Sequence, residues 1–295
     1  MLCQVASAET ELENLLGISR ARNYPPERPI LPGDVQAQAE QDAVELRQRL
    51  GLGNAPVSDL ISLLELEFGV RIYILRLDPR VSGLYAYDEA LGPCILLNAS
   101  HPRSRRVQSA AHECGHFVST RRSPEILRTD SEESSREERY AASFGRAFLM
   151  PARAVKHKFQ EVTAGAHLLS RKHVIVLAHF FGVSREAAVR RLEELGLVKA
   201  GTWDWFQENG GITDQQERQV LGDLATARAG ELEGDRATNL RLNLLAAEAH
   251  KQELLSEGQL SLLMCIDRVE LRSILDSLEI DEDGTSAVRE LPHRP

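Results

Sequence analysis

The pattern of apolar and polar positions predicts two helices followed by a group of strands in the early part of the chain. Residues 35–50 and 58–68 are amphipathic at the helical period. Ser58 is a suitable N-cap for the second helix, and Gly69 is a suitable residue to end it. Alternation with a period of two then predicts three strands, at residues 70–75, 81–87 and 94–97.

The pattern becomes helical again after the strands. Residues 107–118 contain no proline and carry apolar side chains at helical spacing. Another helix is predicted over residues 135–150, where Pro151 ends it. Residues 174–181 and 185–195 then predict a helix-turn-helix, and residues beyond about 213 are again helical in pattern.

The helix at residues 107–118 contains the run His112-Glu113-Cys114-Gly115-His116, which fits the H-E-x-x-H signature of zinc metallopeptidases. Residues four apart lie on nearly the same helix face, so both imidazoles can reach one Zn²⁺. Glu113 can hold a zinc-bound water, whose pKa falls to about 7, and carry its proton to the leaving amine. So short a motif also occurs by chance, but the apolar stripe suits a buried active-site helix. Cys114 points away from both histidines and is interpreted as a packing residue.

A catalytic zinc needs a third protein ligand, which usually comes from a different element. The acidic candidates downstream are Glu125, Asp130, Glu132, Glu133, Glu137 and Glu138. The first four lie in a polar stretch, residues 122–136, that is predicted to be a solvated loop. Glu138 shares a helix face with Ala142 and Gly145, whereas Glu137 shares one with two phenylalanines. Helical phase alone leaves Glu137 and Glu138 both open.

Two motifs resemble those of the ImmA/IrrE family of zinc metallopeptidases. H-E-x-G-H is followed there by E-x-x-A-x-x-F-x-x-x-x-L-M-P, which this chain matches with Glu138, Ala141, Phe144, Leu149, Met150 and Pro151. Upstream, residues 83–87 and 95–98 match the G-x-Y and hydrophobic-x-x-N patterns of the family. The resemblance covers about residues 40–200. It implies that Glu138 is the third ligand, beside His112 and His116.

The approach to the zinc motif departs from the family pattern. Family members carry R-x-R-F-T-x-A-H-E, whereas residues 105–113 of this chain read R-R-V-Q-S-A-A-H-E. The missing phenylalanine and threonine change how the start of the helix packs, but the zinc chemistry needs neither. The acidic, serine-rich segment between His116 and Glu138 is expected to differ among members, so substrate choice is not inherited with the ligands.

Composition limits the class of protein. With 295 residues and 42% hydrophobic content, the chain can hold about two domains. A formal net charge of −9 argues against a nucleic-acid binder as a whole, because phosphate contacts need clustered Lys and Arg. The start of the chain lacks the features of a signal peptide, no run is long enough for a membrane helix, and the four cysteines show no C-x-x-C pairing. We expect a cytoplasmic protein without a membrane partner.

The helix-turn-helix patterns are more suitable for packing or protein contact than for reading DNA. The second helix of the first one carries three basic and three acidic residues, Arg185, Arg190, Arg191, Glu186, Glu193 and Glu194. A second pattern, at residues 254–275, is balanced in charge in the same way. We therefore expect the C-terminal helices to contact protein, either the substrate or a second copy of this chain by self-association, and we expect no direct DNA binding.

Together the patterns predict an α+β fold, with a mainly helical, zincin-like metallopeptidase core, a small three-stranded sheet and a C-terminal helical module. Prolines interrupt regular structure near the start, which predicts an extended N-terminal tail at residues 1–36. The core is expected at 37–200, including the helix-turn-helix-like segment at 172–198. The helical module is expected at 201–276, and an acidic, disordered tail at 277–295.

The leading hypothesis is a zinc-dependent endopeptidase with His112, His116 and Glu138 as ligands and Glu113 as general base. The family resemblance implies cleavage of a helix-turn-helix transcriptional repressor, which releases stress-response or mobile-element genes. An extended substrate segment is expected to add to a sheet edge, at the strand residues Cys94, Ile95, Leu96, Leu97 and Asn98. The alternative is a non-proteolytic regulatory module that keeps the zinc site and binds a repressor or toxin partner. An intact Glu113 disfavours it, because a structural zinc site does not need that carboxylate. A transcription factor is a third interpretation, which the acidity weakens.

Overall fold

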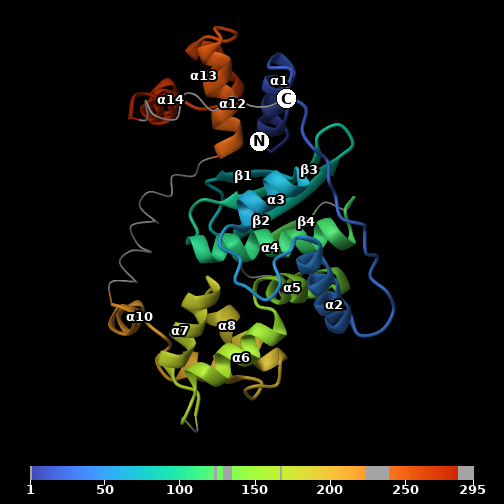
Figure 1. Cartoon of the computed structure of the whole chain (residues 1–295), viewed down its shortest axis with the longest axis vertical. Coiled ribbons are helices and arrows are strands. Elements are labelled where there is room, and N and C mark those ends of the chain that lie inside the picture. Colours follow the sequence, from blue (N-terminus) through green and yellow to red (C-terminus); the bar gives the residue numbers. More distant parts are fainter. Residues whose placement is uncertain (1, 123–124, 129–134, 167, 223–238, 285–295) are drawn as a thin grey trace. The chain divides into compact units, whose positions relative to one another are not determined.

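The computed structural model describes residues 2–122, 125–128, 135–166, 168–222 and 239–284. The chain divides into two compact units. One unit combines both ends of the chain, Met1–Ala21 and Thr238–Pro295, and the other is Arg22–Ala237. We call them the terminal unit and the central unit (Figure 1). The described residues are mainly helical with one small mixed sheet, which confirms the predicted α+β class.

The central unit contains a four-stranded sheet in the order β1-β3-β2-β4. Its strands are β1 (Arg71–Leu75), β2 (Val81–Asp88), β3 (Gly92–Asn98) and β4 (Glu125–Arg128). β3 pairs in parallel with β1 and antiparallel with β2, and β4 pairs antiparallel with the other side of β2. The first three strands are the three that the sequence predicts.

Two predictions about the sheet are wrong. The predicted loop at residues 122–136 contains the fourth strand, β4, which has four residues and is too short to show a clear period. The strand at Cys94–Asn98, expected at an edge, belongs to β3 and is paired on both sides by β1 and β2. All seven residues of β3 are buried, because its nearly continuous apolar run is typical of a central strand and not of an edge.

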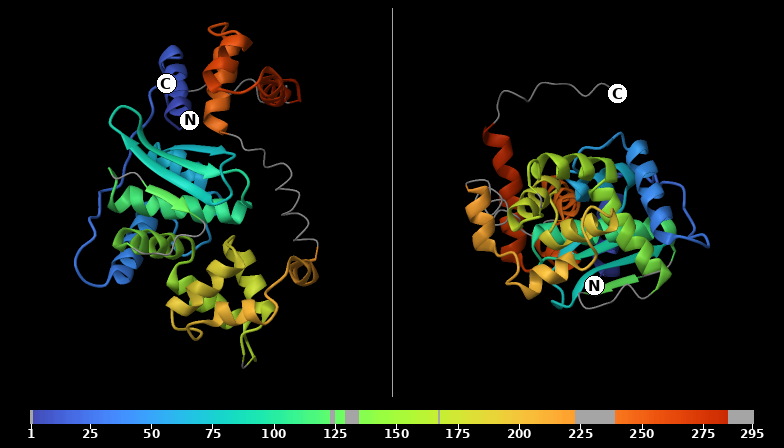
Figure 2. Two further views of the ribbon diagram at one scale, coloured as in Figure 1. Left: turned by 180° about the vertical axis from the view of Figure 1, so that it is seen from behind. Right: turned by 90° about the horizontal axis from the view of Figure 1, so that it is seen from below.

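Helix α4 (Arg103–Ser119) is the central layer of the fold. It packs against β2 and β3 on one side and against α5 (Arg136–Leu149) on the other (Figures 1 and 2). Helix α2 (Val35–Arg49) packs against α5, and α3 (Leu60–Phe68) lies beside β1 and α4. The shared hydrophobic core includes Ile72, Ile95, Leu97, Ala111, Cys114, Phe117, Tyr140, Phe144 and Phe148.

The ends of α3 differ from the prediction at one residue. Asp59, and not Ser58, is the N-cap, because its carboxylate accepts a hydrogen bond from the backbone N–H of Ser62 at 3.1 Å. Gly69 ends the helix in the left-handed conformation, with φ of 71°, as predicted. The predicted element is therefore confirmed, with a start one residue later.

The predicted helix-turn-helix is present in the central unit. It consists of α7 (Arg171–Phe181) and α8 (Arg185–Glu194), with Gly182 in the left-handed conformation at the end of α7. Helix α6 (Ala152–Val162) precedes the pair. This confirms the prediction for the helical part of residues 172–198.

Two further helices pack on this pair and move the domain boundary. Helix α9 (Thr202–Glu208) contacts α8, and α10 (Asp214–Leu221) contacts α7. Phe206 joins a small hydrophobic cluster that also contains Val174, Ile175, Val189 and Ile212. The predicted boundary at residue 201 is therefore wrong, because α9 and α10 complete the central unit.

The terminal unit consists of α1 (Leu2–Leu15), α12 (Leu240–Lys251), α13 (Glu257–Met264) and α14 (Arg268–Gly284). α1 contacts both α12 and α13, and α14 contacts the same two helices. Cys265, with φ of 57°, forms the turn between α13 and α14, which confirms the second helix-turn-helix pattern. None of the described helices is long and apolar enough to cross a membrane.

The predicted tails are partly wrong. Residues 2–15 of the expected extended N-terminal tail form α1, because Val5, Ala8 and Leu12 share a buried helix face. The proline-rich part is extended, as predicted. At the other end, α14 continues through residues 277–284 of the expected disordered tail. Residues 285–295 lie outside the described residues.

A cluster of charged side chains joins the two ends of the chain. Glu9 and Glu13 on α1 are 1% and 5% exposed. Arg20 pairs with both carboxylates, and Arg241 on α12 lies 3.5 Å from Glu9 and 3.0 Å from Glu13. Removal of one guanidinium from such a buried ion-pair group is strongly destabilising, because it leaves buried charge without its full set of partners.

We expect Arg20→Ala to destabilise the terminal unit by about 3 kcal/mol, since it leaves buried carboxylates without one partner. Denaturation followed by circular dichroism reports on both units. Fluorescence reports on the central unit, because Trp203 and Trp205 both lie there. The denaturation midpoint of the terminal unit, followed by circular dichroism, should fall. The midpoint of the central unit, followed by fluorescence, should stay unchanged.

The matched control is Arg272→Ala in the same unit. Arg272 pairs with Glu257 at 2.8 Å, but its side chain is 61% exposed, so its loss should cost about 1 kcal/mol or less. An equal effect of the two substitutions, or a parallel shift of the fluorescence transition, would contradict the prediction.

Candidate metal centre

Two histidines of α4 form one side of the centre. His112 and His116 are one helical turn apart, so their side chains leave the same face of the helix. Their Nε2 atoms lie 3.2 Å from one another. His112 is 8% exposed and His116 is fully buried. The sequence prediction that these two imidazoles meet is confirmed.

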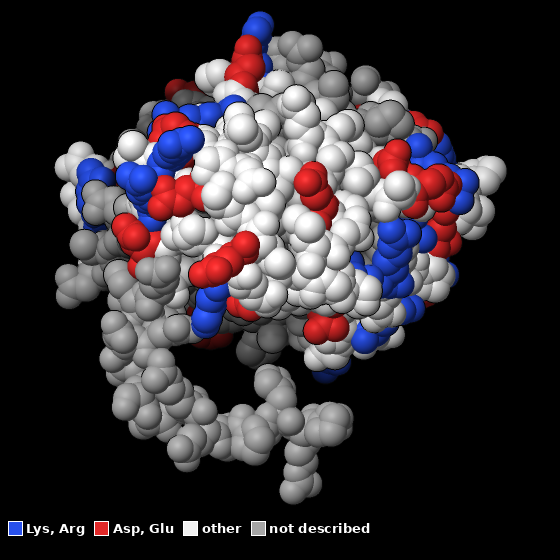
Figure 3. Space-filling view, turned by 90° about the horizontal axis from the view of Figure 1, so that it is seen from above, with Lys and Arg blue, Asp and Glu red and all other residues white. Residues whose placement is uncertain are grey.

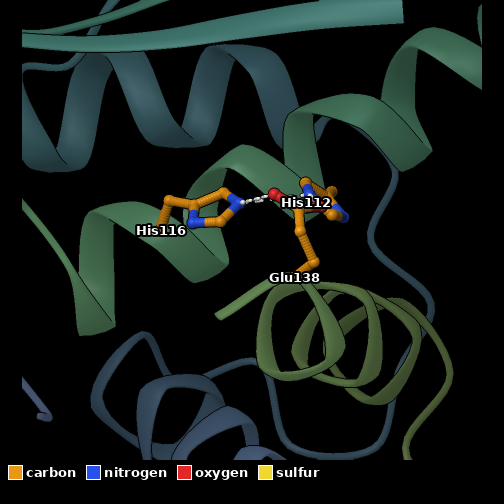
Figure 4. Close-up of side chains that lie close together, drawn as sticks. All are labelled: His112, His116 and Glu138. Carbon is orange, nitrogen blue, oxygen red and sulfur yellow. Dashed lines mark hydrogen bonds and ion pairs between the residues drawn. The ribbon is translucent and has the colours of Figure 1, made fainter. Parts of the chain in front are cut away.

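Helix α5 supplies the third group. The hydroxyl of Ser135 caps this helix by accepting a hydrogen bond from the backbone N–H of Glu138 at 3.0 Å, which fixes Glu138 in the first turn. The carboxylate of Glu138 reaches both imidazoles, with Oε2 at 3.2 Å from Nε2 of His112 and Oε1 at 3.3 Å from Nε2 of His116. Figure 4 shows Glu138 rising from α5 toward the two rings of α4.

The structure brings one of the acidic candidates, Glu138, to the two histidines. Among the described residues, the group of His, Cys, Asp and Glu side chains able to hold a metal consists of His112, His116 and Glu138, and Glu137 is not part of it. Glu125 lies in β4. The remaining candidates, Asp130, Glu132 and Glu133, lie outside the described residues.

The spacing of the two imidazole nitrogens and the Glu138 carboxylate, whose Oε2 faces His112 and whose Oε1 faces His116, is close to what a zinc ion needs. Tetrahedral zinc with bonds of about 2.0–2.1 Å requires ligand atoms about 3.3–3.4 Å apart. The three separations in this cluster are 3.2, 3.2 and 3.3 Å. Two imidazoles and one carboxylate are also the donor set of catalytic zinc sites that leave a fourth position for water or substrate.

The electrostatics of the cluster match what metal ligands require. Burial lowers the pKa of His112, which keeps its imidazole neutral. Hydrogen bonds from His112 and His116 hold the pKa of Glu138 well below its usual range, which keeps its carboxylate ionised. Metal binding needs neutral imidazole and ionised carboxylate, so the pKa shifts of His112 and Glu138 both favour the protonation states of ligands.

Thr120 orients one of the rings. Its Oγ1 atom lies 3.4 Å from Nδ1 of His116, on the side of the ring away from the cluster. With a metal on Nε2, Nδ1 would carry the ring proton and donate a hydrogen bond to the hydroxyl. Sequence reasoning missed Thr120, although its position four residues after His116 is the available signal.

Two glycines allow α4 and α5 to approach closely. A Cβ atom on Gly115 would lie 2.7 Å from Cα of Ala141, and one on Gly145 would lie 3.0 Å from the backbone nitrogen of His112. The separation at Gly115 is shorter than real Cβ contacts, and the one at Gly145 is tight enough that the facing backbone would have to shift by a few tenths of an ångström. The sequence indicated close approach at Gly145, but the role of Gly115, inside the zinc motif, was missed.

The remaining motif residues point elsewhere. Glu113 is fully buried, and its carboxylate lies against Gly83 of β2, where a Cβ would come within 2.9 Å of Oε1. Cys114 lies in the hydrophobic core, where burial raises the pKa of its thiol to about 12. This confirms Cys114 as a packing residue, because a thiol so reluctant to ionise is a poor metal ligand.

The family comparison agrees with this geometry. The family model described as the IrrE N-terminal-like domain, Peptidase_M78, matches residues 66–193. This segment of the chain is therefore similar to the IrrE N-terminal-like domain. The matched residues run from the end of α3 into α8 and include His112, His116 and Glu138, so the matched segment contains the whole candidate centre. A comparison with curated proteins finds no match.

We expect Glu138→Ala to lower zinc affinity by more than about 100-fold. Loss of a residue that only supports a ligand costs up to about 100-fold, and loss of a ligand itself should cost more. Glu137→Ala is the matched control, because it removes the neighbouring carboxylate of the same helical turn. Competition with a chromophoric chelator measures both affinities. The reverse order would show that Glu137, and not Glu138, is the ligand.

Gly115→Ala should lower zinc affinity by about 10- to 100-fold, because the new methyl group pushes α5 and Glu138 away from the histidines. Gly258→Ala is the control, since its Cβ would meet the flexible guanidinium of Arg268 in the other unit. Circular dichroism checks that both variants fold. Unchanged zinc affinity in a folded Gly115→Ala protein would contradict the proposed role of this contact.

Proposed function

We propose that the chain is a zinc-dependent endopeptidase, with His112, His116 and Glu138 as zinc ligands. The observation that carries the proposal is the cluster of two imidazoles and one carboxylate, with N–N and N–O separations of 3.2–3.3 Å, in which the ligand His112 is the sequence neighbour of Glu113. A bound Zn²⁺ would act as a Lewis acid toward the scissile carbonyl and the attacking water. The family match supports a metallopeptidase, and the donor set supports zinc.

Glu113 is the general base in this proposal. Its carboxylate takes a proton from the attacking water and returns it to the nitrogen of the leaving amine. Adjacent residues on a helix are about 100° apart around its axis. The side chain of Glu113 is therefore next to that of the ligand His112 but leaves the helix in a different direction. A fully buried carboxylate is also shielded from bulk water, which strengthens its interaction with the reacting groups.

In this proposal, an extended segment of the substrate binds along β4, the strand at one edge of the sheet. β3 is excluded as a docking edge because β1 and β2 pair with it on both sides. Leu127 of β4 is the register partner of Gly83, the residue that the Glu113 carboxylate touches. An extended peptide beside β4 would therefore lie one strand away from the strand that contacts the base.

We infer that the substrate is a helix-turn-helix transcriptional repressor whose cleavage releases stress-response or mobile-element genes. The support is the resemblance of the motifs to ImmA/IrrE peptidases, together with the family match. We also propose a cytoplasmic location, because repressors act there and the exposed thiols of Cys3 and Cys265 suit a reducing compartment.

Direct DNA binding by this chain is not part of the proposal. The three arginines on α8 are engaged in ion pairs within the chain: Arg185 with Asp214, Arg190 with Asp204, and Arg191 with Glu40. On the face drawn in Figure 3, Lys and Arg side chains lie beside Asp and Glu, and its described residues form no extended basic patch. Phosphate binding needs such clustered, available cations.

We expect Glu113→Gln to keep one zinc per chain and to lose about 10²- to 10⁴-fold in cleavage rate, because it keeps the shape but removes the base. Metal analysis and cleavage of a candidate repressor measure the two effects. Glu137→Gln is the matched control and should cleave at the wild-type rate.

Two outcomes would overturn the proposal in different ways. Wild-type cleavage by Glu113→Gln would remove Glu113 from the mechanism. Stoichiometric zinc with no cleavage of repressors or of an unstructured peptide library, but tight binding of a repressor, would favour the non-proteolytic binding module.

A further inference from the structure

The backbone conformation at Gly83 is one that any residue can adopt, so it does not require glycine. It lies inside β2 and is paired on both sides, with Leu97 of β3 and with Leu127 of β4. Its φ is not in the left-handed region that favours glycine. A glycine inside a paired strand loses side-chain packing and costs conformational entropy, so a residue with a side chain would stabilise this strand better.

The space around Gly83 explains why a side chain is absent. An ideal Cβ there would lie 2.9 Å from Oε1 of Glu113, 3.6 Å from Cγ of Glu113 and 3.4 Å from the carbonyl oxygen of Leu96. The first separation is shorter than real Cβ contacts allow. Glu113 is fully buried, so its carboxylate would have to shift within the packed interior to make room for a side chain at residue 83.

The backbone on both sides of this contact is held in place. On the side of α4, the close contacts at Gly115 and Gly145 hold this helix against α5. Movement of α4 away from the sheet would therefore disturb its packing on α5. On the side of β2, the pairing with β4 is irregular between Val81 and Gly83, which is a β-bulge or a similar shift of register. Irregularities of this kind re-aim residues next to active sites.

We propose that Gly83 is a positioning residue that seats the carboxylate of Glu113. The bare backbone of β2 forms the wall against which Oε1 rests, and any side chain at residue 83 displaces the base. The proposal rests on the proposed function for its catalytic meaning, but the contact between Gly83 and Glu113 stands by itself. The metal ligands lie on α4 and α5, so the effect falls on the base and not on the metal.

The kinetic test is Gly83→Ala in the zinc-loaded protein. We expect zinc affinity and KM to stay within about threefold of wild type, while kcat falls by about 10- to 100-fold, since displacement of a catalytic group by about 1 Å costs about 10²-fold. Gly115→Ala gives the contrasting result, with loss of zinc affinity. Loss of zinc from Gly83→Ala, or an unchanged kcat, would overturn the positioning role.

A double-mutant cycle on the metal-free protein tests the contact without any activity. Gly83→Ala should lower the denaturation midpoint in the wild-type background, because the new methyl group clashes with Oε1. In the Glu113→Ala background the same substitution should leave the midpoint unchanged or raise it, because the clash is gone and alanine suits a strand better than glycine. Equal lowering in both backgrounds would overturn the proposal.

The two tests separate two failures. A wild-type protein that cleaves nothing while the cycle shows strong coupling would refute the peptidase function and support the Gly83–Glu113 contact. A wild-type protein that cleaves its substrate while the cycle shows no coupling would support the function and refute the role of Gly83. Gly258→Ala, in the other unit, controls for the effect of replacing any glycine by alanine.

Discussion

The close contact between α4 and α5 is the constraint on which the candidate centre depends. Two ligands come from one helix and the third from the other, so the separation of the helices sets the distances among the ligand atoms. Gly115 meets Ala141, and Gly145 meets the backbone at His112, with little or no room for a Cβ at either glycine. Helices with ordinary side chains at the contact pack about 8–10 Å apart, and larger side chains would hold Glu138 out of reach.

The same helix directs the carboxylate of Glu113, the proposed base, toward a different partner. His112 and His116 face α5, whereas the carboxylate of Glu113 rests on β2. The candidate ligands are therefore aligned by helix-to-helix packing, and the proposed base is aligned by helix-to-sheet packing. In both places a glycine replaces a side chain at the point of contact, so backbone, which is stiffer than a side chain, sets the distance.

The sequence predicted the centre better than it predicted its surroundings. His112 and His116 follow from helical spacing, and the family motif selected Glu138 where phase alone could not. β4 was missed because four residues show too little periodicity, and β3 was misplaced because strand order depends on contacts between distant segments. Helix α1 packs against α12, which is more than 200 residues away in the sequence, so the role of its buried face could not be inferred from the neighbouring sequence. Gly83 and Gly115 were not recognised as contact points, because a glycine shows its purpose only when the facing atoms are known.

The terminal unit has a consequence for how the chain is made. Helix α1 ends at residue 15, but its partner α12 begins at residue 240, so the ribosome must add the intervening residues before the two can meet. At about 5–20 residues per second, this takes about 10–45 s. During that interval α1 exposes Val5, Ala8 and Leu12 and the two carboxylates that Arg241 later pairs. Helix α1 is therefore synthesised well before its folded state becomes accessible, and its apolar face stays uncovered by α12 during that interval.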